Sequence, residues 1–597
     1  MSPGNASARL LTAFFDFELS AYDFGIVDFL AGAEVVRRHR ACAGIRIVFV
    51  PEAGRAVDGD LHAREALAWR LHNILVPACR LLPTCLGVVV CADRAEAQDV
   101  HARSTDVFPE GYAVERPVDW FGSPWLHLYA LRGEDVQPLR ASPQARAYVD
   151  RWLSERHPGQ KVVAITLRSA PYNPQRNSDP KVWGPFAHRL AQHGFAPVIV
   201  PDTETALLPL DPAFDGLSSL PAAAFNVELR MALYEAAYAN AVTSNGAGTL
   251  CDFSRRTRFI HYRSGEWFAQ PYLHERAAGV KAGRMRAHYS RFQRFARGTH
   301  EPEFLWREFR ALADDIERAG EPPGEHPALQ PDPANREPLG EFAGRLLRYR
   351  QWDILDATLE HMRQDGGDEV LVAYLSSVAA LERGAAGSSA AAGLETVVRS
   401  ISADSDRGWE ARSAAMLVDA LVRLDRLSEA EAWLTAHLAA GTAGPEARGL
   451  LGSVLERLGR HGEAEANYRA AVGGGAANGN VLRGLAQAVE ARGALDEATQ
   501  FYRAAIDHED VPPQCYERLG LILEASTQLD AAVEVYRAAA ARGVATFACY
   551  YRLAMLLKDR GELREALRVL EFLVARGLQH PRIQGPLQEL RAAVARI

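Results

Sequence analysis

Two short segments of the sequence carry the residue types that bind phosphate groups. The first, residues 243–253, reads TSNGAGTLCDF and lies between an apolar run and a predicted helix that begins near Leu250. Its small residues would let an anion approach backbone N–H groups at a helix start, where the peptide dipoles favour negative charge. The residues concerned are Ser244, Asn245, Gly246, Gly248 and Thr249. The same composition also suits a tight strand-to-helix turn, in which glycine serves only for its dihedral freedom.

The second segment is rich in arginine and asparagine. Arg168 ends the apolar run KVVAITLR, and Asn173, Arg176 and Asn177 follow it closely. Guanidinium and amide groups donate strong hydrogen bonds and can surround a pyrophosphate. Arginines in a loop are also common as solvated surface groups. We predict that the two segments converge on one crevice and bind a nucleotide diphosphate there.

Acidic residues follow the first apolar run, in the stretch FFDFELSAYDFG. Asp16 or Glu18 could act as a general base toward a hydroxyl group. Asp23 is better placed to cap a helix that begins at Phe24. We therefore predict that the catalytic carboxylate is Asp16 or Glu18.

No metal site is predicted. Asp58-Gly59-Asp60 has the D-x-D spacing of some metal-binding motifs, but it precedes a predicted helix, and an N-cap role explains Asp60 better. The seven cysteines form no C-x-x-C pair, so the sequence supports neither a structural zinc site nor a disulfide framework.

The elements that must position these residues alternate between short apolar runs and helical stretches, which is typical of a parallel sheet with crossover helices. Strands are expected at 9–19, 45–51, 86–92, 161–168, 196–201, 240–245 and 257–263, and helices at 24–40, 63–82, 142–156, 182–193, 228–238 and 302–318. The distribution predicts two Rossmann-like α/β lobes, residues 1–140 and 141–320. Ligands of such sheets bind beyond the carboxyl ends of the strands, where both phosphate-binding segments fall.

The C-terminal half contains an internal repeat. Units that begin at Leu451, Leu485, Leu519 and Leu553 follow one another at 34-residue intervals. They share a turn residue (Gly459, Gly493, Thr527, Gly561), a small residue (Ala464, Ala498, Ala532, Ala566) and a bulky one (Tyr468, Tyr502, Tyr536, Leu570). This pattern resembles the tetratricopeptide repeat (TPR), a helix–turn–helix unit. It predicts an all-α TPR superhelical solenoid with a C-terminal capping helix over 339–597, after a proline-rich linker at 321–338.

The front half also resembles a known family. A strand with an arginine loop, then PVIVPDTE, then SNGAGTLCDFSRRTRFIHY is similar to the donor half of GT-B glycosyltransferases, including heptosyltransferase-like and fucosyltransferase-like proteins. The resemblance implies that a nucleotide-sugar binds the second lobe and an acceptor the first, with no metal and no further cofactor. It would place Arg168 and Arg176 at the diphosphate, residues 244–249 at the phosphate or sugar, and residues 201–204 near the nucleotide.

Two functions remain open from the sequence. The first is a glycosyltransferase that modifies a protein or a surface-glycan precursor, with the repeats presenting a concave face to a protein or peptide partner. The second is a non-catalytic TPR scaffold that carries a degenerate transferase-like domain. The basic and aromatic segment near residues 263–297 could line the cleft or dock onto the repeats.

The composition of the chain limits the partners and the cellular location that are expected. The chain has 597 residues and a formal net charge of −8, so nucleic acid is not expected as a partner. No signal-peptide pattern and no membrane-spanning run is found, and a cytoplasmic protein is expected. Scarce lysine beside abundant arginine and alanine is typical of a GC-rich bacterial genome. The sequence is compatible with a homo-oligomer.

Overall fold

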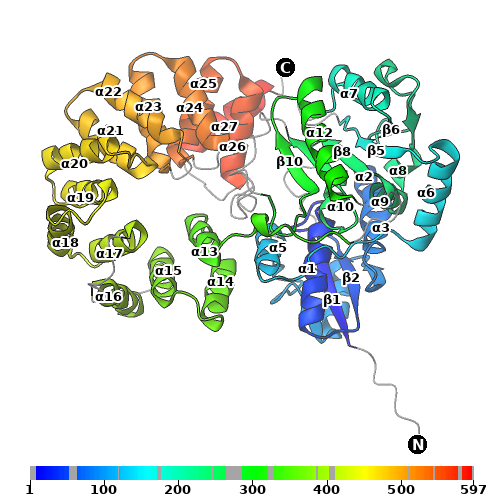
Figure 1. The fold of residues 1–597 in the computed structure, drawn as a ribbon, viewed down its shortest axis with the longest axis horizontal. Helices are drawn as coiled ribbons and strands as arrows, with labels where there is room; N and C mark the ends of the chain where they lie inside the picture. Colours follow the sequence, from blue (N-terminus) through cyan, green and yellow to red (C-terminus); the bar gives the residue numbers. More distant parts are fainter. Residues whose placement is uncertain are drawn as a thin grey trace, which may run out of the picture. The chain divides into compact units, whose positions relative to one another are not determined.

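The computed structural model describes residues 9–52, 64–118, 120, 122–170, 177–243, 246–263, 285–320, 328–384, 388–402, 410–508, 511–541, 545–575 and 581–594. The chain divides into two compact units, the first ending at Pro338 and the second running from Leu339 to Ile597 (Figure 1). The first unit contains two parallel sheets with helices, and the second is an array of helices. The predicted fold class, α/β followed by a helical solenoid, is confirmed.

The first lobe holds a four-stranded parallel sheet in the order β3-β2-β1-β4. Its strands are β1 (Leu10–Asp16), β2 (Gly44–Val50), β3 (Cys85–Val90) and β4 (Asp106–Phe108), and its helices are α1 (Ile26–His39), α2 (Arg64–Arg70), the π-turn η1 (Leu71–Leu75), α3 (Val76–Cys79), α4 (Arg94–Ala102) and α5 (Gly122–Leu131). Both faces of β1 are covered, because Leu11 and Phe15 join one apolar cluster while Phe14 joins another.

The second lobe holds a six-stranded parallel sheet in the order β10-β9-β8-β5-β6-β7. Its strands are β5 (Lys161–Thr166), β6 (Phe195–Val200), β7 (Ser218–Ser219), β8 (Ala239–Thr243), β9 (Phe259–Arg263) and β10 (Gln293–Arg297). Its helices are α6 (Pro143–Arg156), α7 (Pro180–Gln192), α8 (Ala222–Phe225), α9 (Val227–Ala236), α10 (Thr249–Asp252) and α12 (Pro302–Ala319), with 3-10 turns η3 (Pro212–Phe214) and η4 (Gly246–Gly248). Each of the seven predicted strands overlaps an observed one, whereas β4, β7 and β10 were not predicted.

The two lobes share a continuous apolar core. One cluster of buried side chains includes Phe29 and Leu82 of the first lobe together with Leu233 and Phe253 of the second. Backbone hydrogen bonds also cross between them, since Leu139 N donates to Phe253 O at 3.0 Å. The lobes therefore act as one body in which strand ends from both sheets can contribute to one site.

Part of the predicted proline-rich linker packs against this unit. Residues 321–327 lie outside the described residues. Beyond them, Leu329 N donates to Arg255 O at 2.7 Å, and Asp332 N donates to Tyr289 O at 2.8 Å. The buried side chains of His127 and Glu337 are hydrogen-bonded at 2.7 Å. Residues 328–338 thus form a structured extension of the α/β unit.

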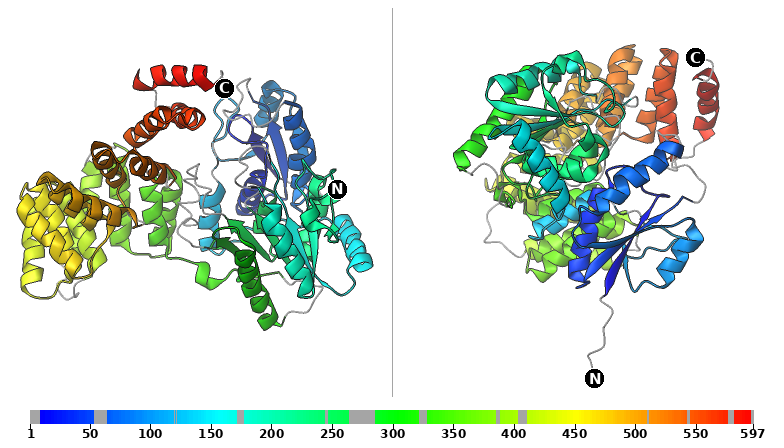
Figure 2. Two further views of the ribbon diagram at one scale, coloured as in Figure 1. Left: turned by 90° about the horizontal axis from the view of Figure 1, so that it is seen from above. Right: turned by 90° about the vertical axis from the view of Figure 1, so that its right-hand side faces the viewer.

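The second unit consists of helices that pack as successive pairs (Figures 1 and 2). They are α13 (Leu339–Arg348), α14 (Trp352–Gln364), α15 (Glu369–Glu382), α16 (Ser388–Ser402), α17 (Ala411–Arg423), α18 (Leu427–Ala439), α19 (Pro445–Arg457), α20 (His461–Gly473), α21 (Gly479–Ala491), α22 (Leu495–Ile506), α23 (Pro513–Ala525), α24 (Leu529–Ala541), α25 (Phe547–Asp559), α26 (Leu563–Ala575) and α27 (Pro581–Val594). Gly459, Gly493 and Gly561 take positive φ at the turns between paired helices, and Thr527 takes φ 58° at the equivalent turn.

A polar relay repeats along this array. The buried hydroxyls of Tyr468, Tyr502 and Tyr536 donate to Glu456 (2.7 Å), Glu490 (2.8 Å) and Glu524 (2.6 Å). The next unit then supplies an arginine to the same carboxylate, as Arg552 does to Glu524 at 2.9 Å. Each relay satisfies a buried hydroxyl and links neighbouring units.

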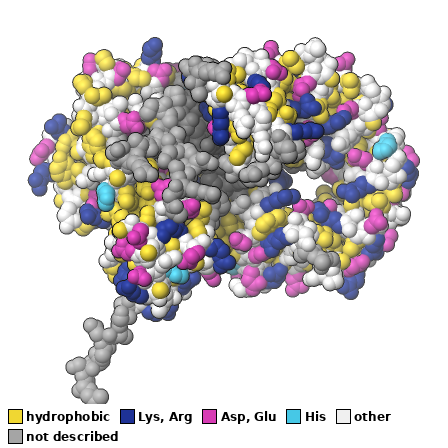
Figure 3. Space-filling view, turned by 180° about the vertical axis from the view of Figure 1, so that it is seen from behind, with side chains coloured by type: hydrophobic (Ala, Val, Ile, Leu, Met, Phe, Trp, Pro, Cys, Tyr) yellow, Lys and Arg dark blue, Asp and Glu magenta, His cyan; other side chains and the backbone are white. Residues whose placement is uncertain are grey.

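Basic and acidic side chains are interspersed on the face of the molecule shown in Figure 3.

In the parts of the chain that the structure describes, no helix is both long and apolar enough to cross a membrane.

Candidate functional site

The two predicted phosphate-binding segments follow neighbouring strands of the second sheet. β5 and β8 pair in parallel, with Thr166 opposite Val242, so their carboxyl ends reach the same edge. β6 pairs with β5 on its other side, and Ser169 N donates to the Asp202 carboxylate at 3.0 Å. The ends of β5, β6 and β8 therefore bring Arg168, residues 201–204 and the glycine turn to one edge of the sheet.

Arg168 lies inside its loop. Its side chain is buried, and its Nη1 donates to Asn177 Oδ1. Asn177 also bonds both backbone polar groups of Ala170, at 3.0 and 2.9 Å, and Arg168 N donates to Ser178 Oγ at 3.0 Å. Arg168 and Asn177 thus close the base of the loop. The predicted ligands Asn173 and Arg176 lie outside the described residues.

The glycine turn is compact and lies against the first lobe. Gly246–Gly248 form one 3-10 turn, and Thr249 Oγ1 closes it by donating to Gly246 O at 2.6 Å. Gly246 is exposed, and a Cβ added there would lie 3.2 Å from Phe24 Cδ2. α10 has only four residues, so the macrodipole of a long helix is not available. The predicted residues Ser244 and Asn245 lie outside the described residues.

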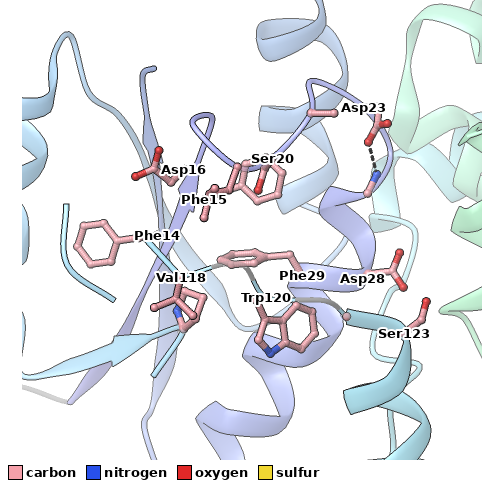
Figure 4. A pocket seen from close by; sticks show the side chains of 15 residues that line it. Phe14, Phe15, Asp16, Ser20, Asp23, Asp28, Phe29, Val118, Trp120 and Ser123 are labelled. Carbon is pink, nitrogen blue, oxygen red and sulfur yellow. Dashed lines mark hydrogen bonds between the residues drawn. The ribbon is translucent and has the colours of Figure 1, made fainter. Parts of the chain in front are cut away.

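A cavity of about 200 Å³ opens at the carboxyl ends of β1 and β4 in the first lobe (Figure 4). Phe29 and Trp120 form an aromatic wall, with ring centroids 6.3 Å apart and the rings nearly perpendicular. Asp16, Asp23 and Asp28 are among the lining residues, and the described lining residues include no Lys, Arg or His. Phe24, which contacts the glycine turn, lies between the lining residues Asp23 and Gly25.

Asp16 is buried and strongly bound within the protein. Arg94 donates to both of its oxygens at 2.9 Å, Tyr112 donates at 2.7 Å, and Glu18 N donates at 3.0 Å. These four bonds match the acceptor capacity of a carboxylate. Burial and the hydrogen bond to Asp16 raise the pKa of Tyr112 well above its ordinary value. The arrangement fixes the end of β1 and leaves the Asp16 carboxylate no free acceptor site for a ligand.

The other predicted acids take different places. Glu18 is half-buried, directly before the lining residues Leu19 and Ser20. Asp23 was predicted to cap a helix starting at Phe24, but α1 begins at Ile26 with Gly25 as its N-cap. Asp23 instead accepts a hydrogen bond from Gly25 N at 2.7 Å. Asp58 and Asp60 lie outside the described residues.

A buried charged cluster joins the cavity to the glycine turn. Arg286 Nη1 lies 3.4 Å from Ser123 Oγ and 4.0 Å from Asp28 Oδ1, and both partners line the cavity. Its Nη2 lies 4.0 Å from Asp252, the last residue of α10, and Asp252 is bonded to His261 at 2.8 Å. A single guanidinium therefore links the first lobe to the short helix that follows the glycine turn.

The protonation states in this cluster follow from burial and charge. Burial alone would raise the pKa of Asp252, but attraction to His261 and Arg286 holds that pKa below its ordinary value. Burial and the charge of Arg286 lower the pKa of His288 well below its ordinary value, so its imidazole is neutral. Sequence reasoning assigned no role to these residues, since they meet only in the folded chain; they lie in the basic segment that contains Arg286 and in the quoted stretch that contains Asp252 and His261.

No group of three or more His, Cys, Asp or Glu side chains among the described residues has the arrangement to hold a metal ion.

Comparisons with known proteins bear on the helical array. A tetratricopeptide repeat family model matches residues 445–473. No curated protein matches the chain. Similar solved structures include YrrB, a TPR protein with an unusual peptide-binding site (17% identity over 34% of this chain and 100% of YrrB, TM-score 0.25), and Pseudomonas aeruginosa PilF (18% over 31% and 84%, TM-score 0.27). A third is MamA (16% over 30% and 98%, TM-score 0.24). The chain carries TPR repeats, and the family match does not extend to residues 1–338.

Proposed function

We propose that the protein is a glycosyltransferase with its donor and acceptor sites in the α/β unit. The second lobe would bind the diphosphate of a nucleotide-sugar, and the cavity of the first lobe would hold the acceptor. One observation carries the proposal: the loops after β5 and β8 leave neighbouring strands, and the turn after β8 contacts Phe24, between two residues that line the cavity. A donor at that edge would lie beside a bound acceptor.

The roles of individual residues follow from their places. Backbone N–H groups of the turn at Gly246–Gly248 would face the diphosphate, because a glycine turn lets an anion approach closely. Arg168 would act from inside its loop, by fixing the loop backbone through Asn177. Of the two predicted bases, Glu18 is the one we assign to proton abstraction, since four donors occupy Asp16.

The TPR array would recruit a protein or peptide partner. TPR units are protein-interaction modules, and arrays of them bind peptides and proteins on a concave face. A partner held there would either carry the acceptor or direct the enzyme to it.

The alternative is a TPR scaffold with an inactive transferase-like unit. The burial of Arg168 and the complete engagement of Asp16 favour this alternative, since neither side chain is presented to a ligand. The two functions differ in whether the α/β unit binds a nucleotide-sugar at all.

The experiment is a calorimetric titration of the full chain with UDP-, GDP-, CMP- and ADP-sugars. A Gly246→Asp variant places a negative charge on the exposed turn and should weaken donor binding at least about tenfold through repulsion. Gln160→Glu is the matched control, because it adds the same charge at the exposed amino end of β5. Absence of binding by every nucleotide-sugar at millimolar concentration would refute the proposal, as would equal binding by the two variants.

A further inference from the structure

The size of the first-lobe cavity limits what it can hold. Its volume of about 200 Å³ lies below the roughly 300–1,000 Å³ of pockets for drug-sized ligands. The walls combine the aromatic side chains of Phe29 and Trp120 with short polar ones (Figure 4). A single sugar ring fits this description, because its apolar face can stack on an aromatic wall while its edge reaches polar groups.

The charge of the cavity is negative. Asp16 is neutralised by Arg94, and Arg286 lies between Asp28 and Asp252, of which Asp252 is also bonded to His261. Asp23 is exposed, and no Lys, Arg or His of the described chain forms an ion pair with it. Because Asp23 keeps its charge at the rim and the described lining contains no basic side chain, a cationic ligand would be attracted there.

The buried hydroxyl of Ser123 is a second feature of the cavity, independent of its charge, that a ligand would have to match. Ser123 lines the cavity and is only 8% exposed. Its Oγ accepts a hydrogen bond from Arg286 Nη1 at 3.4 Å. Its own proton meets no acceptor among the residues that the structure describes, and a buried donor without an acceptor is unfavourable. A ligand oxygen in the cavity would supply that acceptor.

We propose that this cavity binds an amino sugar, a hydroxylated ring that carries a protonated amine. The ammonium group would lie near Asp23, a ring hydroxyl would accept the proton of Ser123, and the ring would stack on the wall that includes Trp120. The aromatic wall also attracts the cation. The role of the amino sugar as acceptor rests on the proposed function. Its binding in the cavity does not, because it requires no nucleotide-sugar donor.

The test uses the full chain and saturation-transfer NMR titrations with three matched sugars. Glucosamine carries the amine, glucose has a hydroxyl in its place, and N-acetylglucosamine has a neutral amide. Glucosamine should saturate, with affinity at least about tenfold higher than either neutral sugar, and its binding should weaken as salt rises. Lysine amide is a fourth probe, which has an amine but no ring hydroxyls, and it should bind more weakly than glucosamine.

Two substitutions locate the binding. Asp23→Asn removes the charge but keeps an oxygen for Gly25 N, and it should lower glucosamine affinity at least about fivefold. Ser123→Ala should lower it about threefold or more. The control is Asp99→Asn on α4, an exposed acid that does not line the cavity, and it should leave affinity unchanged. Melting temperatures close to that of the unsubstituted chain would show that the variants fold.

Three results would overturn the inference: no glucosamine binding, equal binding of glucose and glucosamine, or lysine amide binding as well as glucosamine. Equal affinity in Asp23→Asn and the control would overturn the location. If glucosamine binds as expected but no nucleotide-sugar does, the transferase proposal fails and this inference stands. If a nucleotide-sugar binds and glucosamine does not, the reverse holds.

Discussion

Close packing against Tyr468 in the repeat array makes Gly484 sensitive to a single methyl group. A Cβ added to Gly484 on α21 would lie 2.6 Å from Cε2 and from the hydroxyl oxygen of Tyr468, and closer still to Cζ. The ring cannot retreat freely, since Gly452 bounds it on another side, where an added Cβ would lie 2.8 Å from Cδ1 and Cε1. Tyr468 is also held through its hydroxyl by Glu456 at 2.7 Å.

These contacts set the size of the effect of Gly484→Ala. Overpacking costs about 1–3 kcal/mol, and displacing the tyrosine from a charged acceptor costs about 1.5–3 kcal/mol. Alanine regains about 1 kcal/mol in helix propensity over glycine. We expect a net loss of about 1.5–5 kcal/mol in the free energy of unfolding of the array.

Urea unfolding followed by far-ultraviolet circular dichroism measures this loss, and hydrogen exchange of α20 and α21 localises it. Gly462→Ala on α20 is the matched control, because an added Cβ there meets nothing within 4 Å. That variant should be as stable as the natural chain or slightly more so. If Gly484→Ala unfolds at the same urea concentration as the control, the reasoning about Tyr468 packing is refuted.

Three further predictions concern buried polar groups. Asp16→Asn should destabilise the α/β unit by about 3 kcal/mol or more, because it leaves the mostly buried Arg94 without its counter-ion; the urea midpoint of that unit measures this, and an unchanged midpoint would contradict it. Tyr502→Phe should lower the free energy of unfolding of the array by about 1.5–3 kcal/mol, because it removes the hydrogen bond to Glu490. Amides of α22 should then exchange faster, and exchange that is unchanged or slower would contradict the prediction. Burial and a nearby carboxylate raise the pKa of Tyr129 to about 12, above its ordinary value near 10. The native chain therefore holds this proton longer than the unfolded chain, so stability should fall as pH rises above 10. Tyr129→Phe should lessen that fall in melting temperature.

The strands that the sequence reveals are those buried on both faces. Along β5, Val162 and Ala164 face one apolar cluster while Val163 and Ile165 face the other, so the run is apolar throughout. β10 reads QRFAR and lies at the edge of its sheet, and β4 has only three residues. Short or polar strands acquire their pairing from tertiary contacts, and a periodicity search does not detect them.

The periodic pattern of apolar residues also does not show where a helix is interrupted. The predicted helix at 63–82 is observed as α2, the π-turn η1 and α3, with Pro77 in the first turn of α3. The helix expected near Leu250 is a single turn. In the repeats, by contrast, the 34-residue spacing fixed the helices well, because each unit packs mainly on its neighbours.

For the candidate site, too, the sequence revealed some features and not others. The predicted parallel sheet is observed, and its pairing brings the loops after β5 and β8 to one edge. Asp16 looked like a free carboxylate, but its partners Arg94 and Tyr112 are 78 and 96 residues away in sequence. Arg286 likewise meets Asp28 and Asp252 only through the fold. Pairings over such separations depend on topology, which one sequence does not specify.

Hydrogen–deuterium exchange of the full chain with UDP-, GDP-, CMP- or ADP-sugar added tests the central claim most directly. The claim is that one ligand occupies the edge where the β5 and β8 loops adjoin the first-lobe cavity. The account predicts slower exchange at residues 168–170, 177–179 and 246–252, together with the facing segment 18–25, in the presence of one of these nucleotide-sugars. Unchanged exchange in all of these segments with every nucleotide-sugar, or protection confined to other parts of the chain, would contradict it.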